Sequence, residues 1–295
     1  MKYLYILIFT LIFTANSYAQ DPTFVWSKAM SGTDFEYGNS IGFDAAGNIF
    51  VLGIFAGTVD FDPGVGTFYL TSSGQYDIYV SKLNSSGDFI WAKSIGGNSD
   101  DQGKDIAISV SGDIYITGHF EETVDFDPGS GTVNLTSNTS GSPDIFVAKL
   151  DNSGNLLWAK SIGGISNDFC NSITVDFSGN VFITGHFEET VDFDPGIGIF
   201  NLTAATGSVN IFISKLNAIG NFVWAKAIGS SGFYRGRSIT LDALSNVYTT
   251  GSFSGTADFD PGSGVSNLVS AGSNDIYISK LDSSGNFLLA KSMGE

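Results

Sequence analysis

Most of this 295-residue chain is one unit repeated at a nearly constant interval, and that interval limits the folds open to it. Tryptophans recur at steps of 65, 67 and 66 residues, and a leucine continues the series 65 residues later: Trp26, Trp91, Trp158, Trp224 and Leu289. The sequence DFDPG recurs in step with them, beginning at Asp60, Asp125, Asp192 and Asp258. A unit of about 66 residues therefore fills the chain after its first residues.

Within a unit, the apolar residues follow the period of β-strands. In the first unit we expect four short strands, at residues 40–44, 49–55, 78–83 and 89–95. Turn sequences such as DAAGN, DFSGN and DNSGN separate them, and each supplies a Gly or Asn that tolerates a positive φ. No window after the first residues shows a convincing helical period, so we expect almost no helix.

A four-stranded antiparallel unit of this length predicts an all-β fold, a β-propeller built from four-stranded blades. A β-solenoid is the alternative, but its coils usually repeat every ~20–30 residues. We expect a signal peptide at residues 1–19 and a repeat domain at residues 20–295, with units at about 31–96, 97–163, 164–229 and 230–294. Residues 24–30 match the fourth strand of a blade whose other strands are missing. The chain would thus hold four full repeats plus an extra N-terminal strand, in an incomplete or open ring.

Two stretches resemble a known repeat. The run WAKSIGGNSDDQGKDIAISVSGDIYITG (residues 91–118) and the run DIFVAKLDNSGN (residues 144–155) resemble the bacterial β-propeller repeat called SBBP. The DFDPG insertion resembles a version of that repeat in secreted proteins of the Bacteroidetes. The resemblance implies a propeller in a secreted or surface protein, and it implies no catalytic residues. Four units are fewer than the seven blades for which the family is named, so the chain looks like a piece of a longer repeat protein.

The first residues predict secretion. Lys2 precedes an apolar run from Leu4 to Ala15, and the small residues that follow predict cleavage after Ala19. An uncleaved anchor helix is the alternative, but the run is shorter than the ~20 residues that a membrane span needs. We therefore expect a protein that is secreted or held at the outer cell surface, without a membrane span.

The charge balance excludes some partners. The chain has 30 acidic and 13 basic residues, a formal net charge of −17. Such a surface repels phosphate backbones, so we expect no nucleic-acid binding. Cys170 is the single cysteine, which rules out an intrachain disulfide. It stands where the other units have Gly38, Gly103 and Gly236, so a packing role is the favoured interpretation.

The DFDPG copies raise the question of metal binding. Their aspartates lie two residues apart, so on a strand both carboxylates would point to one side, and carboxylates beside turn carbonyls suit Ca²⁺. The alternative is that they only build a turn by binding backbone amides. The candidate calcium ligands are Asp60, Asp62, Asp125, Asp127, Asp192, Asp194, Asp258 and Asp260.

One loop, SSGFYRGRS at residues 230–238, departs strongly from the repeat. Phe233, Tyr234 and Arg235 could form an aromatic and cationic contact patch, or the loop could simply have drifted. His119 and His186 share one repeat position, but another unit has Ile54 there, which favours packing over catalysis.

No catalytic constellation unique to one unit is apparent, and an active site normally requires one. The favoured function is therefore a non-catalytic module that binds an extracellular protein or glycan. The alternatives are an extracellular polysaccharide hydrolase or lyase with paired carboxylates, and a purely structural spacer. An open set of blades would expose apolar faces and invite self-association.

Overall fold

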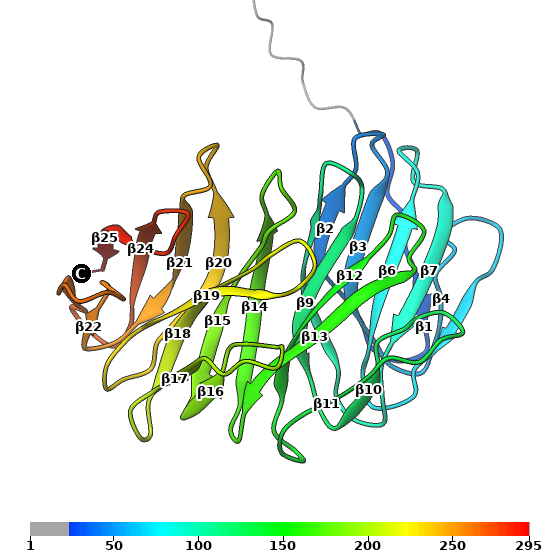
Figure 1. The fold of residues 1–295 in the computed structure, drawn as a ribbon. Helices are drawn as coiled ribbons and strands as arrows, with labels where there is room; N and C mark the ends of the chain where they lie inside the picture. The colour runs from blue at the N-terminus through cyan, green and yellow to red at the C-terminus, as the bar shows by residue number, and fades with distance from the viewer. Residues whose placement is uncertain (1–23, 295) are drawn as a thin grey trace, which may run out of the picture.

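The computed structural model describes residues 24–294, and every regular element in that range is a β-strand (Figure 1). Four blades, each built on four antiparallel strands, stand side by side in chain order. The predicted all-β, four-bladed architecture without helix is thereby confirmed for the described part of the chain. The predicted signal peptide, with its cleavage after Ala19, lies outside the described residues. Within residues 24–294 no helix occurs that could cross a membrane.

Each blade orders its strands as they occur in the chain. The first blade consists of β2 (Glu36–Phe43), β3 (Ile49–Phe55), β6 (Asp77–Leu83) and β7 (Phe89–Ile95). The second consists of β8 (Gln102–Ile108), β9 (Ile114–Phe120), β12 (Asp144–Leu150) and β13 (Leu156–Gly164). The third consists of β14 (Asp168–Val175), β15 (Val181–Glu188), β18 (Val209–Leu216) and β19 (Phe222–Ile228). The fourth consists of β20 (Arg235–Leu241), β21 (Val247–Phe253), β24 (Asp275–Leu281) and β25 (Phe287–Met293).

The predicted strands of the first blade lie where they were expected. β3 and β7 have the predicted bounds, β6 begins one residue earlier, and β2 begins at Glu36 rather than at residue 40. Turn chemistry explains where β2 ends, because Asp44 Oδ1 accepts hydrogen bonds from the amides of Ala46 and Asn48, at 3.0 and 2.9 Å. Gly47 completes this turn with a φ of +78°.

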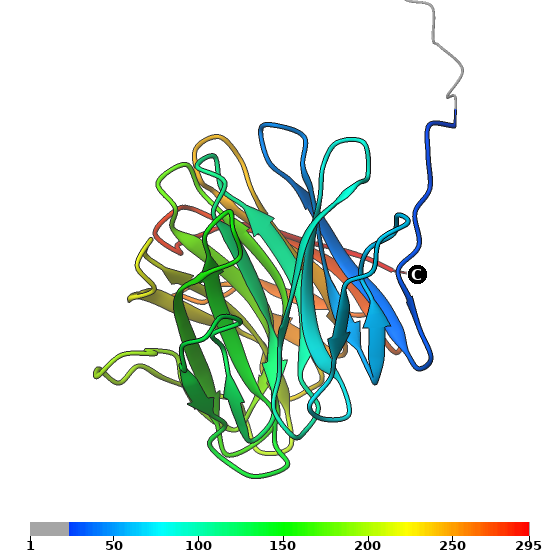
Figure 2. The same ribbon diagram turned by 90° about the vertical axis from the view of Figure 1, so that its right-hand side faces the viewer.

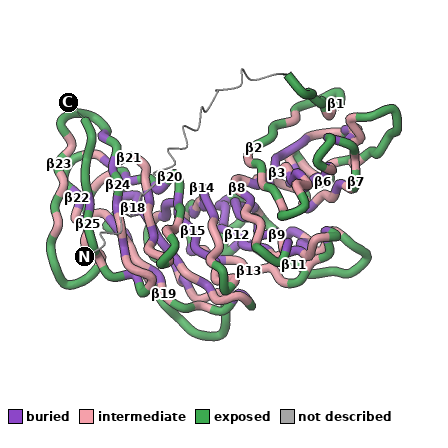
Figure 3. The backbone as a smooth tube through the Cα atoms, turned by 90° about the horizontal axis from the view of Figure 1, so that it is seen from above, coloured by how far each residue is buried: buried purple, intermediate pink, exposed green. Residues whose placement is uncertain are grey.

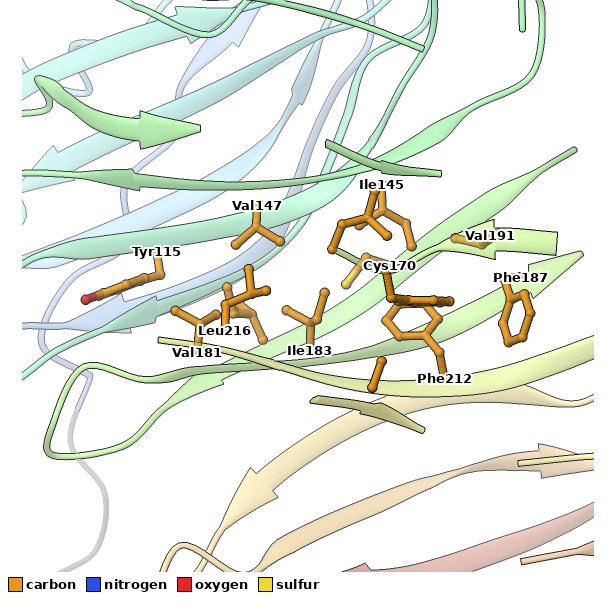
Figure 4. Close-up of a cluster of buried hydrophobic side chains, with 14 of the residues drawn as sticks. Tyr115, Ile145, Val147, Cys170, Val181, Ile183, Phe187, Val191, Phe212 and Leu216 are labelled. Carbon is orange, nitrogen blue, oxygen red and sulfur yellow. The ribbon is translucent and has the colours of Figure 1, made fainter. Parts of the chain in front are cut away.

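Three of the four hydrophobic clusters lie between neighbouring blades, and the fourth lies within the first blade and its hairpin (Figure 3). Figure 4 shows Ile145 and Val147 of the second blade facing Cys170 and Ile183 of the third, and all four are fully buried. Each sheet alone would leave such side chains in water, so stacking of neighbouring blades supplies most of the apolar burial. Cys170 occupies this core, and burial raises the pKa of its thiol to about 12.

The repeated tryptophans fasten each blade to the next. Trp91 packs on Gly154 of the following blade, where an added Cβ would lie 3.2 Å from the indole ring. Trp158 and Trp224 pack in the same way, and each indole Nε1 donates to a carbonyl of the following blade, of Ala218 and Ser283 respectively, at 3.3 Å. Since Gly154 also has a φ of +79°, glycine is required there on both counts.

The DFDPG segments form small hairpins between the second and third strand of each blade. They are β4 (Thr58–Asp60) with β5 (Tyr69–Thr71), β10 (Thr123–Asp125) with β11 (Asn134–Thr136), β16 (Thr190–Asp192) with β17 (Asn201–Thr203), and β22 (Thr256–Asp258) with β23 (Asn267–Val269). The hairpin of β16 and β17 belongs to the third blade, and its strand β16 pairs with the end of β13 in the second blade. This hairpin therefore connects the third blade to the sheet of the second. The expectation of a strand through both aspartates was wrong, because the strand ends at the first one.

The predicted strand at residues 24–30 is not formed. A fourth strand pairs with the third strand of its own blade, whereas residues 24–30 pair with no strand of the described range. The segment still makes the contacts that the fourth strand of one blade makes with the next blade. Trp26 packs on Gly87, and β1 (Ser31–Gly32) pairs with β4. No strand pairing connects the first and last blades in the described range, so the blades form an open arc (Figures 2 and 3).

Candidate functional site

The first strand of every blade contains a β-bulge at the same place, and these strands follow one another along the inner side of the arc (Figure 3). The extra residue in each bulge is Asn39, Lys104, Asn171 and Arg237 in turn. The second strand places a glycine beside the bulge, and a Cβ at Gly118 would lie 1.8 Å from the carbonyl oxygen of Gln102. A bulge redirects its side chain, so four equivalent positions point toward one axis.

Three of these bulge residues line a cavity of about 340 Å³ on the inner side of the second, third and fourth blades. We call this cavity the central pocket. Its lining combines bulge residues, the residues two positions before them, and two residues of the second strands: Gln102, Lys104, His119, Phe169, Asn171, His186, Arg235 and Arg237. Strand pairing explains the histidines, because His119 lies opposite Gln102 and His186 opposite Phe169.

The central pocket is where the chain departs most from its own repeat. Nine of the 13 basic residues occupy two repeat positions, and apart from Lys2 the remaining three are Lys104, Arg235 and Arg237. All three line this pocket. The first blade has Tyr37, Asn39 and Ile54 at the equivalent positions, and none of them carries a charge.

These three cations have no carboxylate partner. Within residues 24–294 none of them forms an ion pair within 4.0 Å, and Lys104 Nζ instead donates to Gln102 Oε1 at 2.6 Å. Burial lowers the pKa of Lys104, the nearby charge of Asp100 opposes this, and the charge of Arg237 adds a smaller lowering. Positive charge therefore accumulates here in a protein whose net charge is −17.

The two histidines are neutral and packed around one ring. Phe169 lies between them, edge-on to His119 with ring centroids 4.7 Å apart and stacked on His186 at 5.0 Å. Burial lowers the pKa of both imidazoles to about 3, with a further contribution from the nearby cations. Asn171 Nδ2 lies 3.3 Å from His186 Nδ1 and donates to the carbonyl oxygen of Gly236 at 2.7 Å. His119 Nδ1 is buried without a hydrogen-bond partner in the described structure.

The arrangement suits an anion that also carries neutral polar groups. Arginine and lysine side chains offer charged donors, and the amides and imidazoles offer neutral ones. No carboxylate lines the pocket. A second cavity, of about 380 Å³, lies near the turns at the other end of the inner strands and includes Val110, Phe177 and Leu241 in its lining. It holds no basic side chain, so it lacks the charged donors of the central pocket.

The candidate calcium ligands are spread over four hairpins, and their carboxylates bind backbone amides. Asp125 Oδ1 accepts from the amides of Asp127 at 3.0 Å and Val133 at 2.9 Å, and Asp127 Oδ1 accepts from Gly129 at 2.8 Å. The other three hairpins repeat these bonds. Among residues 24–294 no three His, Cys, Asp or Glu side chains are grouped to hold a metal ion. Calcium binding stays a prediction.

The three residues proposed as a contact patch lie in different surroundings. Tyr234 is fully buried; its amide donates to the carbonyl oxygen of Val209 in the third blade at 2.9 Å and its hydroxyl to that of Thr256 in the fourth at 3.0 Å, which ties the two blades together. Phe233 is 60% exposed, and Arg235 belongs to the central pocket. Sequence reasoning therefore placed Arg235 in a candidate site but missed Lys104, Arg237 and their neighbours. The signal that could have found them is that these basic residues break the repeat.

A family model described as SBBP, a β-propeller repeat, matches residues 157–186, which run from β13 into β15. The chain therefore contains this repeat.

Two curated proteins are similar to the chain. An uncharacterized WD repeat-containing protein, L264 of Acanthamoeba polyphaga mimivirus, is 27% identical, and the match covers 66% of this chain and 15% of that protein. The regulatory protein FlaEY of Caulobacter vibrioides is 22% identical over 77% of this chain and 22% of its own length. The chain thus spans less than a quarter of either relative. A crystal structure of a protein of unknown function from Bacteroides caccae matches 82% of this chain and 94% of that one at 9% identity, but its TM-score of 0.26 is too low to support any argument.

Proposed function

We propose that this chain is a secreted or cell-surface, non-catalytic propeller module that binds an extracellular protein or glycan on the inner side of its arc. The observation that carries the proposal is the central pocket, in which the three basic residues that break the repeat come together. A structural spacer has no need to gather unpaired cations in a cavity. A binding site does, because one ligand requires one set of differently placed groups.

Binding is tested with the mature chain and a panel of immobilised extracellular glycans and proteins. The variant is Arg235→Ala with Arg237→Ala, and the control is Lys291→Ala, an exposed basic residue outside the pocket. We expect wild type and control to be retained alike on at least one ligand, with the double variant retained at least about tenfold less, because charge-assisted hydrogen bonds are lost. Equal retention of all three proteins would contradict binding in this pocket.

Export is a separate part of the proposal. Its support is the order of Lys2, the apolar run and the small residues before Ala19. N-terminal sequencing of the protein from the medium or the cell surface should begin at Gln20. Recovery of an unprocessed chain only inside the cell would contradict it.

One observation favours an enzymatic alternative. A lyase needs a base, and the central pocket holds Lys104 with a lowered pKa beside two neutral histidines. A hydrolase with paired carboxylates is less consistent with a lining that has none. Incubation with acidic polysaccharides, followed by ultraviolet absorbance of unsaturated products, separates a lyase from a binding module.

A further inference from the structure

We propose that the central pocket binds an acidic glycan, with the carboxylate of a uronate residue held by Lys104, Arg235 and Arg237. This inference rests on the proposed function and names the ligand class of the same site. Three features of the pocket support it: its excess of basic side chains, its neutral polar groups and its size.

The basic side chains of the central pocket favour an anionic ligand. Lys104 and Arg237 come from different blades, and they lie close enough for the guanidinium charge to lower the pKa of the lysine. Neither forms an ion pair within the described structure. Asp100 partly offsets the charge of Lys104, but no carboxylate lines the pocket itself, so a bound carboxylate would give the two exposed arginines a counterion. Arginine also suits carboxylates geometrically, because its planar group can donate two parallel hydrogen bonds.

The neutral polar side chains of the central pocket favour a ligand that carries hydroxyl groups. His119 and His186 are 7% and 8% exposed, and their low pKa values keep both imidazoles uncharged. A carboxylate only accepts hydrogen bonds, whereas a hydroxyl both donates and accepts, so a hydroxyl pairs with either imidazole tautomer. The amide of Gln102 and the half-buried ring of Phe169 line the same cavity. Charged donors beside neutral polar groups and an aromatic ring match a sugar acid.

The size favours a glycan over a protein surface. The pocket is an open hollow of about 340 Å³, near the lower end of the volumes of small-ligand sites, ~300 Å³. A stable protein interface instead buries about 800 Å² on each partner. The pocket therefore fits a short stretch of a sugar chain that enters from the inner side of the arc.

The test uses isothermal titration calorimetry on the mature chain with trigalacturonate and trimannuronate. Each acid is matched by its methyl ester, which keeps the sugar and removes the charge. We expect saturable binding of at least one acid, an affinity that falls as salt rises, and binding of its ester at least about tenfold weaker. An ester that binds as tightly as its acid, or the absence of binding by both acids, overturns the proposal.

Variants locate the site. Arg237→Ala and Lys104→Gln should each weaken uronate binding about tenfold, while Lys291→Ala should leave it unchanged. His119→Ile copies the residue that the first blade has at this position, so it keeps an apolar packing partner and removes only the polar nitrogens. It should weaken binding of the acid severalfold without altering the salt dependence. Thermal melting of each variant confirms that the fold is retained.

The two proposals can fail separately. Wild-type binding by Lys104→Gln and Arg237→Ala would place the uronate elsewhere and overturn the inference. Oligoglutamate that binds in the pocket when neither uronate does would also overturn it, while leaving a binding module for an acidic protein segment. Failure of the proposed function itself would appear as equal retention of Arg235→Ala with Arg237→Ala and wild type on every ligand of the panel.

Discussion

At the scale of single residues, the DFDPG motif is explained by how its hairpin anchors to the blade. The phenylalanine between the aspartates is fully buried in each copy: Phe126 packs edge-on against Phe120 with ring centroids 5.3 Å apart, and tilted against Phe146 at 5.0 Å. Asp125 closes the hairpin by accepting two amides. Gly131 leaves room for the second carboxylate, since a Cβ there would lie 2.1 Å from Asp127 Oδ2. The two aspartates and the phenylalanine of the motif therefore have structural roles without a ligand.

Calcium binding by the same aspartates is tested directly. Asp125 and Asp127 use Oδ1 for amides, which leaves Oδ2 of each as a possible ligand. If Ca²⁺ binds there, titration into the chelator-treated chain gives saturable heat and a higher melting temperature, and both are reduced by Asp125→Asn with Asp127→Asn. No heat and no shift would leave the aspartates as turn-building residues.

The two glutamates that open a hairpin are under backbone strain. Glu122 and Glu189 have φ values of 59° and 54°, where the first and fourth blades have Gly57 and Gly255. Glu189→Gly should stabilise the protein by about 0.5–1 kcal/mol, because relief of the left-handed conformation outweighs the added entropy of the unfolded chain. Urea denaturation measures this change. Glu188→Gly, next to it in β15, is the control and should destabilise.

At the scale of elements, blades are joined by polar groups near the hairpins as well as by the tryptophans. Gly164 donates its amide to Asp168 Oδ2 at 2.7 Å, which links β13 to β14. Burial raises the pKa of Asp168 to about 8, and the charge of Asp144 adds to this. The third and fourth blades replace this acid pair by Asn210 and Tyr234. The junction between the third and fourth blades therefore contains neutral side chains. Protonated Asp144 and Asp168 are neutral too, so they also avoid burying a charge.

This junction predicts a dependence of stability on pH. Burial raises the pKa of Asp144 from 3.8 to about 7, so its contribution is complete below pH 3.8 and is lost as the pH rises through about 7. His119 and His186 act in the opposite direction, because their pKa values are lowered from 6.5 to about 3 and their contribution is lost as the pH falls through that range. Comparing a variant at residue 144 with the wild-type protein isolates the contribution of Asp144 to the pH dependence of stability.

Asp144→Asn is that variant, and Asn210 already occupies the equivalent position of the third blade. At pH 8 it should raise the free energy of unfolding by about 1–3 kcal/mol, since a buried charge is removed. Near pH 4 the two proteins should be nearly equal. Urea titrations at both pH values measure the difference. The expectation is wrong if Asp144→Asn destabilises equally at both.

At the scale of the whole molecule, the open arc leaves two blade faces uncovered. Ile276 and Ile278 of the fourth blade are 53% and 39% exposed, whereas Ile211 and Ile213, their equivalents in the third, are fully buried. At the other end Ile41 is 57% exposed, while the equivalent Ile106 is buried. Side chains that elsewhere form the core between blades therefore face water at both ends of the described arc.

We predict that the mature chain self-associates through these faces. Sedimentation velocity should show a mean mass that rises with protein concentration, because packing one chain's last blade on another's first buries both sets of isoleucines. Ile276→Lys with Ile278→Lys should abolish the rise. Val65→Lys, at an exposed hairpin tip, is the control and should not. A monomer at every concentration would contradict this prediction.

The sequence by itself determined the blades, because their causes are local and recur. Alternating apolar residues defined β3 and β7, and a motif such as DAAGN placed its turn through the bonds of one aspartate and the positive φ of one glycine. The tertiary structure decided which residues meet. Lys104, Asn171 and Arg237 lie 67 and 66 positions apart in the chain and share one pocket only because each blade turns its bulge toward the same axis. It also decided that Tyr234 is buried and that residues 24–30 form no strand. Those outcomes depend on neighbouring blades, which the local pattern does not encode.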